Sequence, residues 1–317
     1  MCIGKKDNIR NKTGLDDITK QTRNIINRRF YGRAVYLLII IFISTSLIGC
    51  SKDIKEPPPL KLRVSILPDE SREKLLERYT PLFEYLSKEI GIPYELIFPK
   101  NYKESLELFH AKKVDLAYFG GYTFVKANIS DNAVPLVMRD VDKKFTSYFI
   151  VKGDDPAQKL RDFKGRSFSF GSRLSTSGHL MPRYFLNKIG IVPEDFFSDV
   201  LYSGSHDITA YWVSDRKVEL GVSNPFVINK MYTDGRLDNK EVRVLWETPP
   251  YPNYVWAVRP QINNALKTKL RKAFLSLSKT NRDHKKILEG VDAGGFVRTS
   301  VKDFSNLRRI IYKLKLL

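Results

Sequence analysis

From residue 62 onward, short apolar runs alternate with segments in which apolar residues recur at three- or four-residue spacing. The runs at 62–67, 94–98 and 114–119 are short and end at turn residues, which is typical of strands. Between them, the apolar positions from 75 to 90 would line one face of a helix, and residues 102–111 predict a second helix. This order of strands and helices indicates an α/β fold with a mainly parallel sheet.

The same alternation recurs further along the chain. More strands are predicted at 145–151, 167–170, 218–223, 242–245 and 254–258, and the chain ends in helices at 262–278, 283–288 and from 301 onward. A polar turn at 171–178 leads into another helix that stops at Gly190. Within the first helix, Pro81 is expected either to kink the helix or to start a second one with Thr80 as its cap.

The first 49 residues are expected to be an export signal. Residues 1–33 carry nine basic and three acidic side chains, residues 34–43 are apolar and uncharged, and the small residues Ser44–Ser46 follow. A basic head, an apolar stretch too short for a comfortable membrane span and small residues before a cut site are features of such a signal. The alternative is a plain transmembrane anchor, which the short apolar stretch disfavours.

The residues around Cys50 predict how the exported chain is held. Leu47-Ile48-Gly49-Cys50 resembles the bacterial lipobox, in which the cysteine thiol receives diacylglycerol and becomes the mature N-terminus. The polar, proline-ended stretch at 50–60 is of the kind that spaces a domain from a surface. We therefore expect a signal peptide over 1–49, lipidation of Cys50, a tether over 50–60 and a domain on the extracytoplasmic side of the membrane, either periplasmic or at the cell surface.

Composition narrows the possible function classes. Lys and Arg outnumber Asp and Glu by 54 to 35, which implies an anionic partner: a small ligand, a phospholipid surface or a nucleic acid. Both cysteines, Cys2 and Cys50, lie outside the predicted domain, which excludes a disulfide scaffold, a cysteine–zinc site and cysteine catalysis there. The four histidines form no His-Glu-x-x-His pair, so a zinc hydrolase is not expected, and no metal or cofactor is predicted.

The segment Ser175-Thr176-Ser177-Gly178 carries the clearest chemistry. It lies between a predicted strand and a predicted helix, so three hydroxyls and the free N–H groups of a helix start would lie together. Such groups could hold a tetrahedral oxyanion without a lysine or an arginine. Gly178 would let a ligand approach the backbone closely. The alternative is an ordinary helix cap with serines for solubility.

Three further side chains are candidates for the same site. Tyr118 ends a predicted strand, where ligands of open α/β sheets bind, although it could equally be an aromatic plug. His206 begins a helix within Ser205-His206-Asp207, although it could be a capping or core histidine. Glu219 lies in an otherwise apolar strand, where a buried carboxylate needs donors, although it could face solvent on an edge strand.

Together these motifs resemble a known family. The motifs are Leu67-Pro68-Asp69-Glu70-Ser71, Tyr118-Phe119-Gly120, Ser175–Gly178, Ser205-His206-Asp207 and Pro250-Tyr251-Pro252-Asn253-Tyr254. In combination they resemble the substrate-binding proteins of ABC importers for phosphate, phosphite and phosphonates, over most of residues 61–300. The resemblance implies a two-lobed type II periplasmic-binding-protein fold, in which each lobe is a mostly parallel sheet flanked by helices, and no enzyme activity.

The resemblance also implies roles for residues and segments of this chain. Tyr118, Ser175, Thr176, Ser177 and His206 would hold a phosphorus oxyanion, and Glu219 stands where the family usually has an aspartate. Residues 61–147 and 254–317 would form one lobe, and residues 148–253 the other. Hinge closure would bury the anion and present a monomeric, lipid-anchored receptor to an ABC permease.

An acid beside an anion has a physical rationale. A carboxylate repels a fully ionised guest, but it accepts a hydrogen bond from one that retains a P–OH group. Phosphate and some phosphonates carry such a proton near neutral pH, whereas sulfate does not. We therefore expect Glu219 to discriminate against sulfate.

Three other functions are weighed against import. Ser175 or Ser177 with His206 and Asp207 could form a catalytic triad, but Asp207 is adjacent in sequence to His206 and no Gly-x-Ser-x-Gly elbow is present. The same fold could serve as the input domain of a sensor that passes its ligand to a signalling partner. A nucleic-acid partner is not expected, because export removes it and the basic residues are dispersed.

Overall fold

The computed structural model describes residue 57 and residues 59–317. The predicted signal peptide over 1–49, the lipidated Cys50 and most of the tether over 50–60 therefore lie outside the described residues. Within the described part of the chain, none of the helices combines the length and the apolar character that a membrane span requires.

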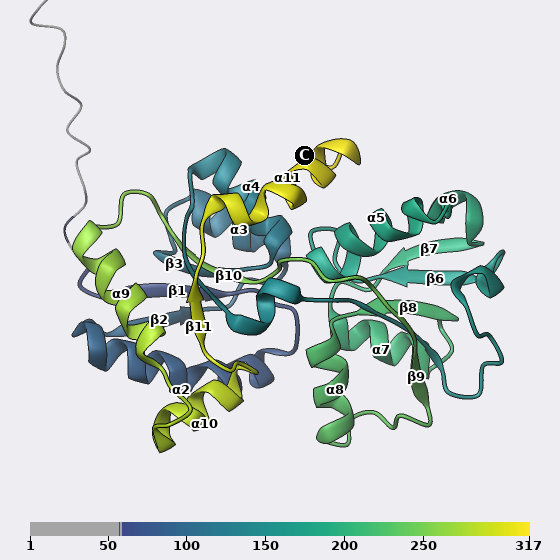
Figure 1. Cartoon of the computed structure of the whole chain (residues 1–317), viewed down its shortest axis with the longest axis horizontal. Helices are drawn as coiled ribbons and strands as arrows, with labels where there is room; N and C mark the ends of the chain where they lie inside the picture. The colour runs from purple at the N-terminus through teal and green to yellow at the C-terminus, as the bar shows by residue number, and fades with distance from the viewer. Residues whose placement is uncertain (1–56, 58) are drawn as a thin grey trace, which may run out of the picture. The chain divides into compact units, whose positions relative to one another are not determined.

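The strands form two sheets (Figure 1). The strands of the first sheet, in spatial order, are β11 (Phe296–Arg298), β4 (Val134–Arg139), β10 (Val255–Val258), β3 (Leu116–Phe119), β1 (Leu62–Ile66) and β2 (Tyr94–Ile97). The strands of the second sheet are β7 (Asp199–Tyr202), β6 (Ser167–Phe170), β8 (Leu220–Ser223), β5 (Tyr148–Lys152) and β9 (Val242–Glu247).

Most strands of each sheet run in one direction. In the first sheet β1 is parallel to β2 and β3, while β10 is antiparallel to β3 and β4 and β11 is antiparallel to β4, so β1 to β4 share one direction. In the second sheet β6 is parallel to β7 and β8, and only β5 is reversed among its neighbours β8 and β9. The prediction of mostly parallel sheets is confirmed, and the carboxyl ends of several strands meet at one edge of each sheet.

Helices cover both faces of each sheet. The α-helices are α2 (Arg72–Ile90), α3 (Tyr102–His110), α4 (Gly121–Asp131), α5 (Met181–Lys188), α6 (Pro193–Phe196), α7 (His206–Ser214), α8 (Pro225–Thr233), α9 (Asn264–Ser276), α10 (Arg282–Gly290) and α11 (Ser305–Lys313). The shorter helical turns are η1 (Asp140–Lys144), η2 (Leu160–Phe163), η3 (Thr176–Leu180) and η4 (Val301–Phe304). In Figure 1, α2, α9 and α10 lie on one side of the first sheet and α3, α4 and α11 on the other, while α5 and α6 lie opposite α7 and α8 across the second sheet.

Helix α2 shows how local sequence sets an element. Ser71 caps its start by accepting the N–H of Lys74, and Gly91 ends it in the left-handed conformation with φ 72°. Pro81 lies inside the helix, which continues from Arg72 to Ile90 as one element. The alternative of a second helix opening at Pro81 is therefore wrong.

Apolar side chains fill the space between these layers. One buried cluster, which includes Phe83, Phe119 and Trp256, surrounds the first sheet. The second sheet has a cluster on each face, because successive side chains of a strand point to opposite sides: Phe149 of β5 belongs to one cluster and Ile150 to the other. Burial of apolar surface on both faces fixes the two sheets and the strand edges that face the site.

Two connecting segments run side by side between the sheets. Phe145 and Tyr251 exchange both backbone hydrogen bonds at 2.8 Å, and the backbone N–H of Asn253 donates to the carbonyl of Asp142 at 2.9 Å. The Thr248 N–H donates to the carbonyl of Ser147 at 3.0 Å. The chain therefore passes between the two sheets through a paired stretch at 142–147 and 248–253.

Eight of the described elements have no counterpart among the predicted ones. They are α4, β4, η1, η2, α6, β7, α8 and β11. Strand β4 contains Pro135, and α4 begins with Gly121, residues that normally mark breaks in regular structure. Long-range pairing and packing decide the structure of these segments.

Candidate functional site

The three hydroxyl residues 175–177 lie at the start of a helix and are buried. Ser175, Thr176 and Ser177 are only 1–2% exposed. Ser175 caps the helix, because its Oγ accepts the N–H of Gly178 at 2.9 Å. The first turn is a wide π-turn, in which the Leu180 N–H donates to the Ser175 carbonyl at 3.0 Å. Ser175 therefore lies at a buried helix start, as predicted for an anion site, and it also caps that helix, as the alternative proposed.

The backbone carbonyls of this segment are hydrogen-bonded elsewhere. The Oγ of Ser147 donates to the Ser177 carbonyl at 2.8 Å, and the N–H of Gly171 donates to the Gly178 carbonyl at 2.8 Å. A Cβ on Gly178 would lie 3.0 Å from Cε1 of His206 and 3.2 Å from Cα of Gly171. The glycine therefore allows the helix start to lie directly against the histidine ring.

His206 faces two of the serines from the first turn of α7. Its Nε2 lies 3.5 Å from the Oγ atoms of both Ser175 and Ser177. The backbone N–H of Asn224 donates to Nδ1 at 3.2 Å, so Nδ1 is the acceptor and Nε2 carries the proton. Burial lowers the pKa of His206 to about 4, and the ring is a neutral donor at physiological pH.

The geometry does not form a catalytic triad. A triad needs an acid on Nδ1–H of the histidine and a free Nε2 to take the serine proton. Here Nδ1 of His206 accepts from a backbone amide, and the Oδ1 of Asp207 accepts from the Ile208 N–H at 2.9 Å and from the Ser205 hydroxyl. The arrangement donates hydrogen bonds and does not activate a nucleophile.

Thr176 connects the hydroxyl cluster to the start of α4 through a hydrogen bond. Its Oγ1 accepts the backbone N–H of Tyr122 in the first turn of α4 at 2.9 Å. A Cβ on Gly120 would lie 3.2 Å from this Oγ1, so the glycine before α4 permits the approach. The starts of α4, of the η3–α5 helix and of α7 therefore meet around the three hydroxyls, and each adds the partial positive charge of a helix N-terminus.

Tyr102 is a further member of the cluster that was not predicted. Burial raises the pKa of the Tyr102 phenol well above its ordinary value, the charge of Asp69 adds to this effect, and a hydrogen bond with Ser175 opposes it. The residue starts α3 directly after β2, behind the capping Asn101. The rule that ligands bind beyond the carboxyl ends of strands, applied to β2 as it was to β3, would have found it.

Tyr118 lies in the aromatic wall. Its ring is stacked on Tyr254 at 5.0 Å between centroids and packs against Trp256 at 4.6 Å. Its hydroxyl is buried and makes no hydrogen bond within the described part of the chain. Burial raises the pKa of Tyr118, and the guanidinium of Arg139 opposes this rise. The aromatic-plug alternative describes its contacts.

Asp69 is a buried carboxylate on the same edge of the first sheet. Its backbone carbonyl accepts the N–H of His206 at 3.2 Å, and its Oδ2 accepts the Tyr254 hydroxyl at 2.7 Å. The Asn224 amide donates in turn to the Tyr254 oxygen at 3.0 Å. Burial is the main cause of a raised pKa at Asp69. A buried acid within Leu67–Ser71, at a strand end, was a signal available in the sequence.

Glu219 lies away from this cluster, and its prediction as a ligand residue is corrected. Its side chain is 42% exposed and pairs with Arg166 at 2.8 Å, while its Oε2 accepts the N–H of Ser167 at 2.9 Å. Both Ser167 and Glu219 lie at the amino ends of their parallel strands. The hydroxyl cluster lies at the carboxyl ends, about five residues or ~16 Å further along β8.

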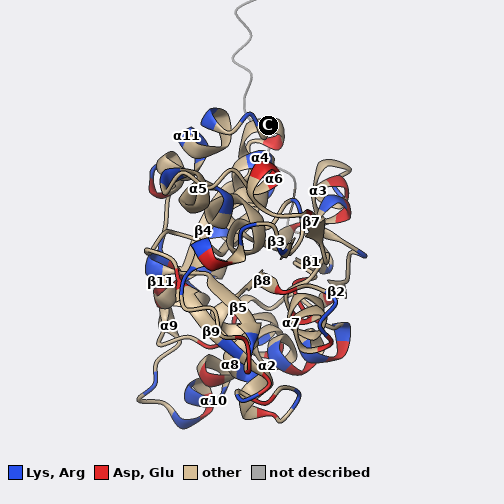
Figure 2. Ribbon diagram, turned by 90° about the vertical axis from the view of Figure 1, so that its right-hand side faces the viewer, with Lys and Arg blue, Asp and Glu red and all other residues tan. Residues whose placement is uncertain are grey.

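The arginines near the cluster bind other side chains of the protein. The guanidinium of Arg183 binds Glu194 and donates to Nε2 of His179 at 3.0 Å. The buried Arg139 forms two 2.8 Å hydrogen bonds with the carboxylate of Asp142. In Figure 2 the Lys and Arg residues are interspersed with Asp and Glu along the ribbon. The cluster itself consists of neutral donors and one carboxylate.

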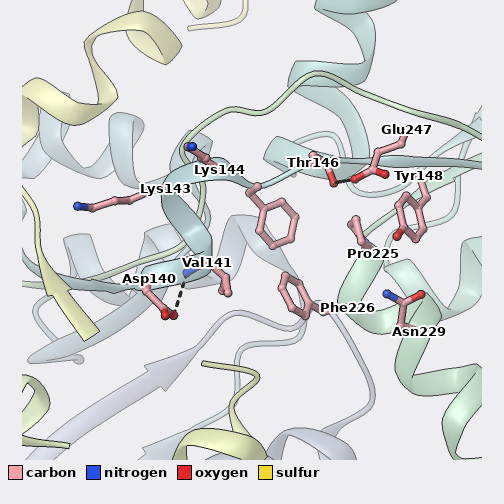
Figure 3. Close-up of a pocket in the computed structure, with 11 residues that line it drawn as sticks. Asp140, Val141, Lys143, Lys144, Thr146, Tyr148, Pro225, Phe226, Asn229 and Glu247 are labelled. Carbon is pink, nitrogen blue, oxygen red and sulfur yellow. Dashed lines mark hydrogen bonds between the residues drawn. The ribbon is translucent and has the colours of Figure 1, made fainter. Parts of the chain in front are cut away.

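A separate surface pocket of about 560 Å³ lies beside the connecting segments. Its lining residues are Asp140, Val141, Lys143, Lys144, Phe145, Thr146, Tyr148, Pro225, Phe226, Asn229 and Glu247. Figure 3 shows the Lys143 and Lys144 ammonium groups extending away from Phe226. Carboxylates at Asp140 and Glu247 also border the pocket, so it is a poor site for an anion. Among the described residues, no group of three or more His, Cys, Asp or Glu side chains is placed to hold a metal ion.

Comparison with known proteins identifies relatives over most of the chain. A family model described as "ABC transporter, phosphonate, periplasmic substrate-binding protein" matches residues 64–304. A probable ABC transporter phosphite-binding protein, PhnD1, of Prochlorococcus marinus is 30% identical over 268 residues, covering 81% of this chain and 90% of that protein. The structure of PhnD1 with methylphosphonate has a TM-score of 0.76 at 29% identity and covers 82% of this chain and 100% of that chain.

Two other relatives are named for related ligands. A phosphonates-binding periplasmic protein of Escherichia coli is 26% identical and covers 78% of this chain and 75% of that protein. A phosphate-import protein, PhnD, of Mycolicibacterium smegmatis is 27% identical and covers 66% of this chain and 71% of that protein.

Proposed function

This chain belongs to the family of phosphonate periplasmic substrate-binding proteins of ABC transporters, and we propose that it captures a phosphorus oxyanion for import. The ligand is phosphate, phosphite or a small phosphonate, which are the ligands in the names of its relatives. Proteins of this family bind a substrate and deliver it to a transporter, so no catalysed reaction is assigned. The relatives are transporter components, and they do not favour a sensor domain.

One observation carries this proposal: the hydroxyls of Ser175 and Ser177 face Nε2–H of His206, next to the buried Thr176, where helix starts converge. A tetrahedral oxyanion offers several acceptor oxygens, and this cluster offers several short, neutral donors. Hydrogen bonds to a charged group contribute about 1.5–3 kcal/mol each, and they strengthen where water is excluded. Tyr102 adds a phenol to the set through its contact with Ser175.

We further propose that the protein closes on its ligand about the paired connecting segments. Residues 61–147 and 254–317 would form one lobe and residues 148–253 the other. Contacts between elements of the two sheets support this proposal: Thr176 with Tyr122, His206 with Asp69, and Asn224 with Tyr254. These contacts surround the donor cluster, so separating the two sheets would open it to solvent.

A ligand screen tests the assigned cargo. The full-length chain, purified in detergent, is titrated with phosphite, methylphosphonate, phosphate and sulfate, and the melting temperature is recorded. A ligand present at 100 times its Kd should add about 2.7 kcal/mol to the free energy of unfolding. Absence of a shift with every phosphorus oxyanion would refute the proposal. The double variant Ser175→Ala/Ser177→Ala removes two donors and should show a smaller ligand-induced shift, measured against its own melting temperature without ligand.

The lipid anchor and the permease complete the proposed function. We propose that Cys50 carries the lipid and that the exported domain hands its ligand to an ABC permease. The support is the Leu47-Ile48-Gly49-Cys50 motif with its polar tether. Radiolabelled fatty acid should be incorporated into the wild-type chain and not into Cys50→Ala. Equal labelling of the two chains would place the lipid elsewhere or exclude it.

A further inference from the structure

Asp69 is a buried carboxylate that forms no ion pair with any of the described residues. The guanidinium groups that act on its pKa are committed to other acids, Arg78 to Glu70 and Arg139 to Asp142. A buried, unpaired carboxylate is costly unless it gains a proton or a donor. Its only side-chain hydrogen bond within the described residues is the one that Tyr254 donates to Oδ2. Oδ1 is therefore the atom that still lacks a partner.

The hydrogen-bond chain fixes which carboxylate oxygen can carry a proton. The amide of Asn224 donates to the Tyr254 oxygen, so the phenol proton must point to Oδ2 of Asp69. Oδ2 is thus an acceptor, and a proton on this carboxyl would lie on Oδ1. Oδ2 of Asp69 is therefore hydrogen-bonded within the protein, and Oδ1 is available to a ligand.

The position of Asp69 brings its carboxyl group close to the donor cluster. Asp69 follows β1 at the carboxyl edge of the first sheet, and its carbonyl accepts the N–H of His206. Its carboxyl group is also linked to His206 through two residues, because Tyr254 donates to Oδ2, the Asn224 amide donates to the Tyr254 oxygen, and the Asn224 N–H donates to Nδ1 of His206. The carboxyl group of Asp69 therefore lies next to the donor cluster.

A phosphorus oxyanion beside Asp69 can share one proton with it. Either the ligand donates a P–O–H to an ionised carboxylate, or a protonated carboxyl donates to a P–O⁻ oxygen. Both arrangements contain the same single proton, and both make one hydrogen bond. Sulfate holds no proton near neutral pH, so the carboxyl would have to take its proton from solvent before sulfate could bind.

On this basis we propose that Asp69, and not Glu219, is the carboxylate that faces the ligand, and that it selects oxyanions able to share a proton. The assignment rests on the proposed function, because it names the class of oxyanion that the same site accepts. Phosphite, phosphate and phosphonates meet the requirement. Sulfate does not.

The test counts protons taken up on binding. The full-length chain is titrated with methylphosphonate by calorimetry in buffers of different ionisation enthalpy, at a pH above the second pKa of the ligand, where the free ligand is a dianion. We expect the wild type to take up about one proton per ligand. Asp69→Asn should take up close to none and should bind at least about tenfold more weakly. Its preference for methylphosphonate over sulfate should fall when it is measured at neutral pH, where part of the free methylphosphonate still carries a proton.

A matched control separates the two acids. Glu219→Gln should keep the wild-type affinity, proton uptake and selectivity, because Glu219 lies at the opposite end of the strands. The reverse pattern, in which Glu219→Gln loses proton uptake and Asp69→Asn keeps it, would overturn the assignment. His206→Asn should bind methylphosphonate more weakly but still take up one proton per ligand. A loss of proton uptake in this variant would assign the proton to His206 and would also overturn the role of Asp69.

The outcomes distinguish this inference from the proposed function. Failure of the wild type to bind any phosphorus oxyanion would refute the function itself. Tight binding without proton uptake would leave the function standing and overturn only the role of Asp69. If Asp69→Asn does not fold, the number of protons that the wild type takes up still tests the role of Asp69. Tyr254→Phe then serves as the second variant: it should keep this proton uptake, because it removes only the donor to Oδ2.

Discussion

The backbone N–H of Asn224 donates to Nδ1 of His206 at 3.2 Å, which orients a neutral imidazole with its Nε2–H toward Ser175 and Ser177. A protonated ring would bring an Nδ1–H against this amide, so the hydrogen bond disfavours the charged form. Burial acts in the same direction. The ring therefore donates to the site without adding a positive charge.

His206 should contribute a pH-dependent part of the stability. Burial lowers its pKa to about 4, against an ordinary value of 6.5, so the unfolded chain binds more protons between these values. This contribution is complete above pH 6.5 and is lost as the pH falls toward 4, by about 3 kcal/mol. His206→Asn should thus lose less stability than the wild type on acidification, as measured by urea unfolding.

The comparison between the two chains isolates His206. His179 also has a pKa lowered to about 4 by burial, but it is present in both chains and cancels in the difference. Equal losses of stability in the wild type and in His206→Asn between neutral and acid pH would contradict the prediction.

The family and the α/β fold with two mostly parallel sheets were predictable from short, ordered motifs. The comparisons confirm the family, and the structure confirms that Ser175–Ser177 and His206 come together. Hydroxyl residues at a strand-to-helix turn have few alternative places in such a fold. The position of this turn in the chain thus predicts its position at the sheet edge.

The acid at the site was not predictable from strand pattern alone. Glu219 is an acid beside an apolar strand, but one strand length separates the amino end, where it lies, from the carboxyl end that faces the cluster. Which end of a strand faces a ligand depends on the strand's direction within the sheet. Asp69 and Tyr102 follow strands at the correct end, and their proximity to His206 and Ser175, respectively, depends on packing between segments that are far apart in sequence.

Two serines of the cluster should respond differently to the loss of the hydroxyl. Ser175 caps the helix through its bond from Gly178, whereas the hydroxyl of Ser177 has His206 as its partner among the described residues. Ser177→Ala should lower ligand affinity about tenfold or more with little effect on stability. Ser175→Ala should lower affinity and also reduce the free energy of unfolding by about 1 kcal/mol. Calorimetry and urea unfolding measure the two effects, and identical stability losses would refute the distinction.

Two tyrosines offer a similar contrast. A hydrogen bond with Ser175 acts on the pKa of the Tyr102 phenol, while Tyr118 stacks on Tyr254 and its hydroxyl has no hydrogen-bond partner in the described structure. Tyr102→Phe should weaken methylphosphonate binding by about tenfold, since a donor to the anion is lost. Tyr118→Phe should lower the affinity less, since the ring packing is kept. A larger loss of affinity for Tyr118→Phe than for Tyr102→Phe, by calorimetry, would restore Tyr118 as the ligand residue.

Arg236 should hold the closed form without touching the ligand. Its guanidinium binds Oε1 of Glu70 at 2.7 Å, and Arg78 binds Oε2 at 3.0 Å, so both oxygens of a carboxylate with no exposed side-chain surface are paired. Glu70 follows β1 of the first sheet, and Arg236 lies between α8 and β9 of the second-sheet segment. In the proposed hinge motion, separation of the sheets would let water reach Glu70, whereas the proposed closed form keeps it paired with both arginines.

Arg236→Gln should therefore destabilise the closed form relative to the open one by about 1–3 kcal/mol, through a buried acceptor left with a weaker partner. Because the change acts on closure, the affinities for phosphite and methylphosphonate should fall by the same factor, mainly through faster dissociation in stopped-flow experiments. Arg216→Gln is the control, since Arg216 pairs with the exposed Asp154 and should have no effect. Unequal losses for the two ligands would mean that Arg236 acts at the ligand, and unchanged dissociation would mean that the Glu70 pair does not stabilise closure.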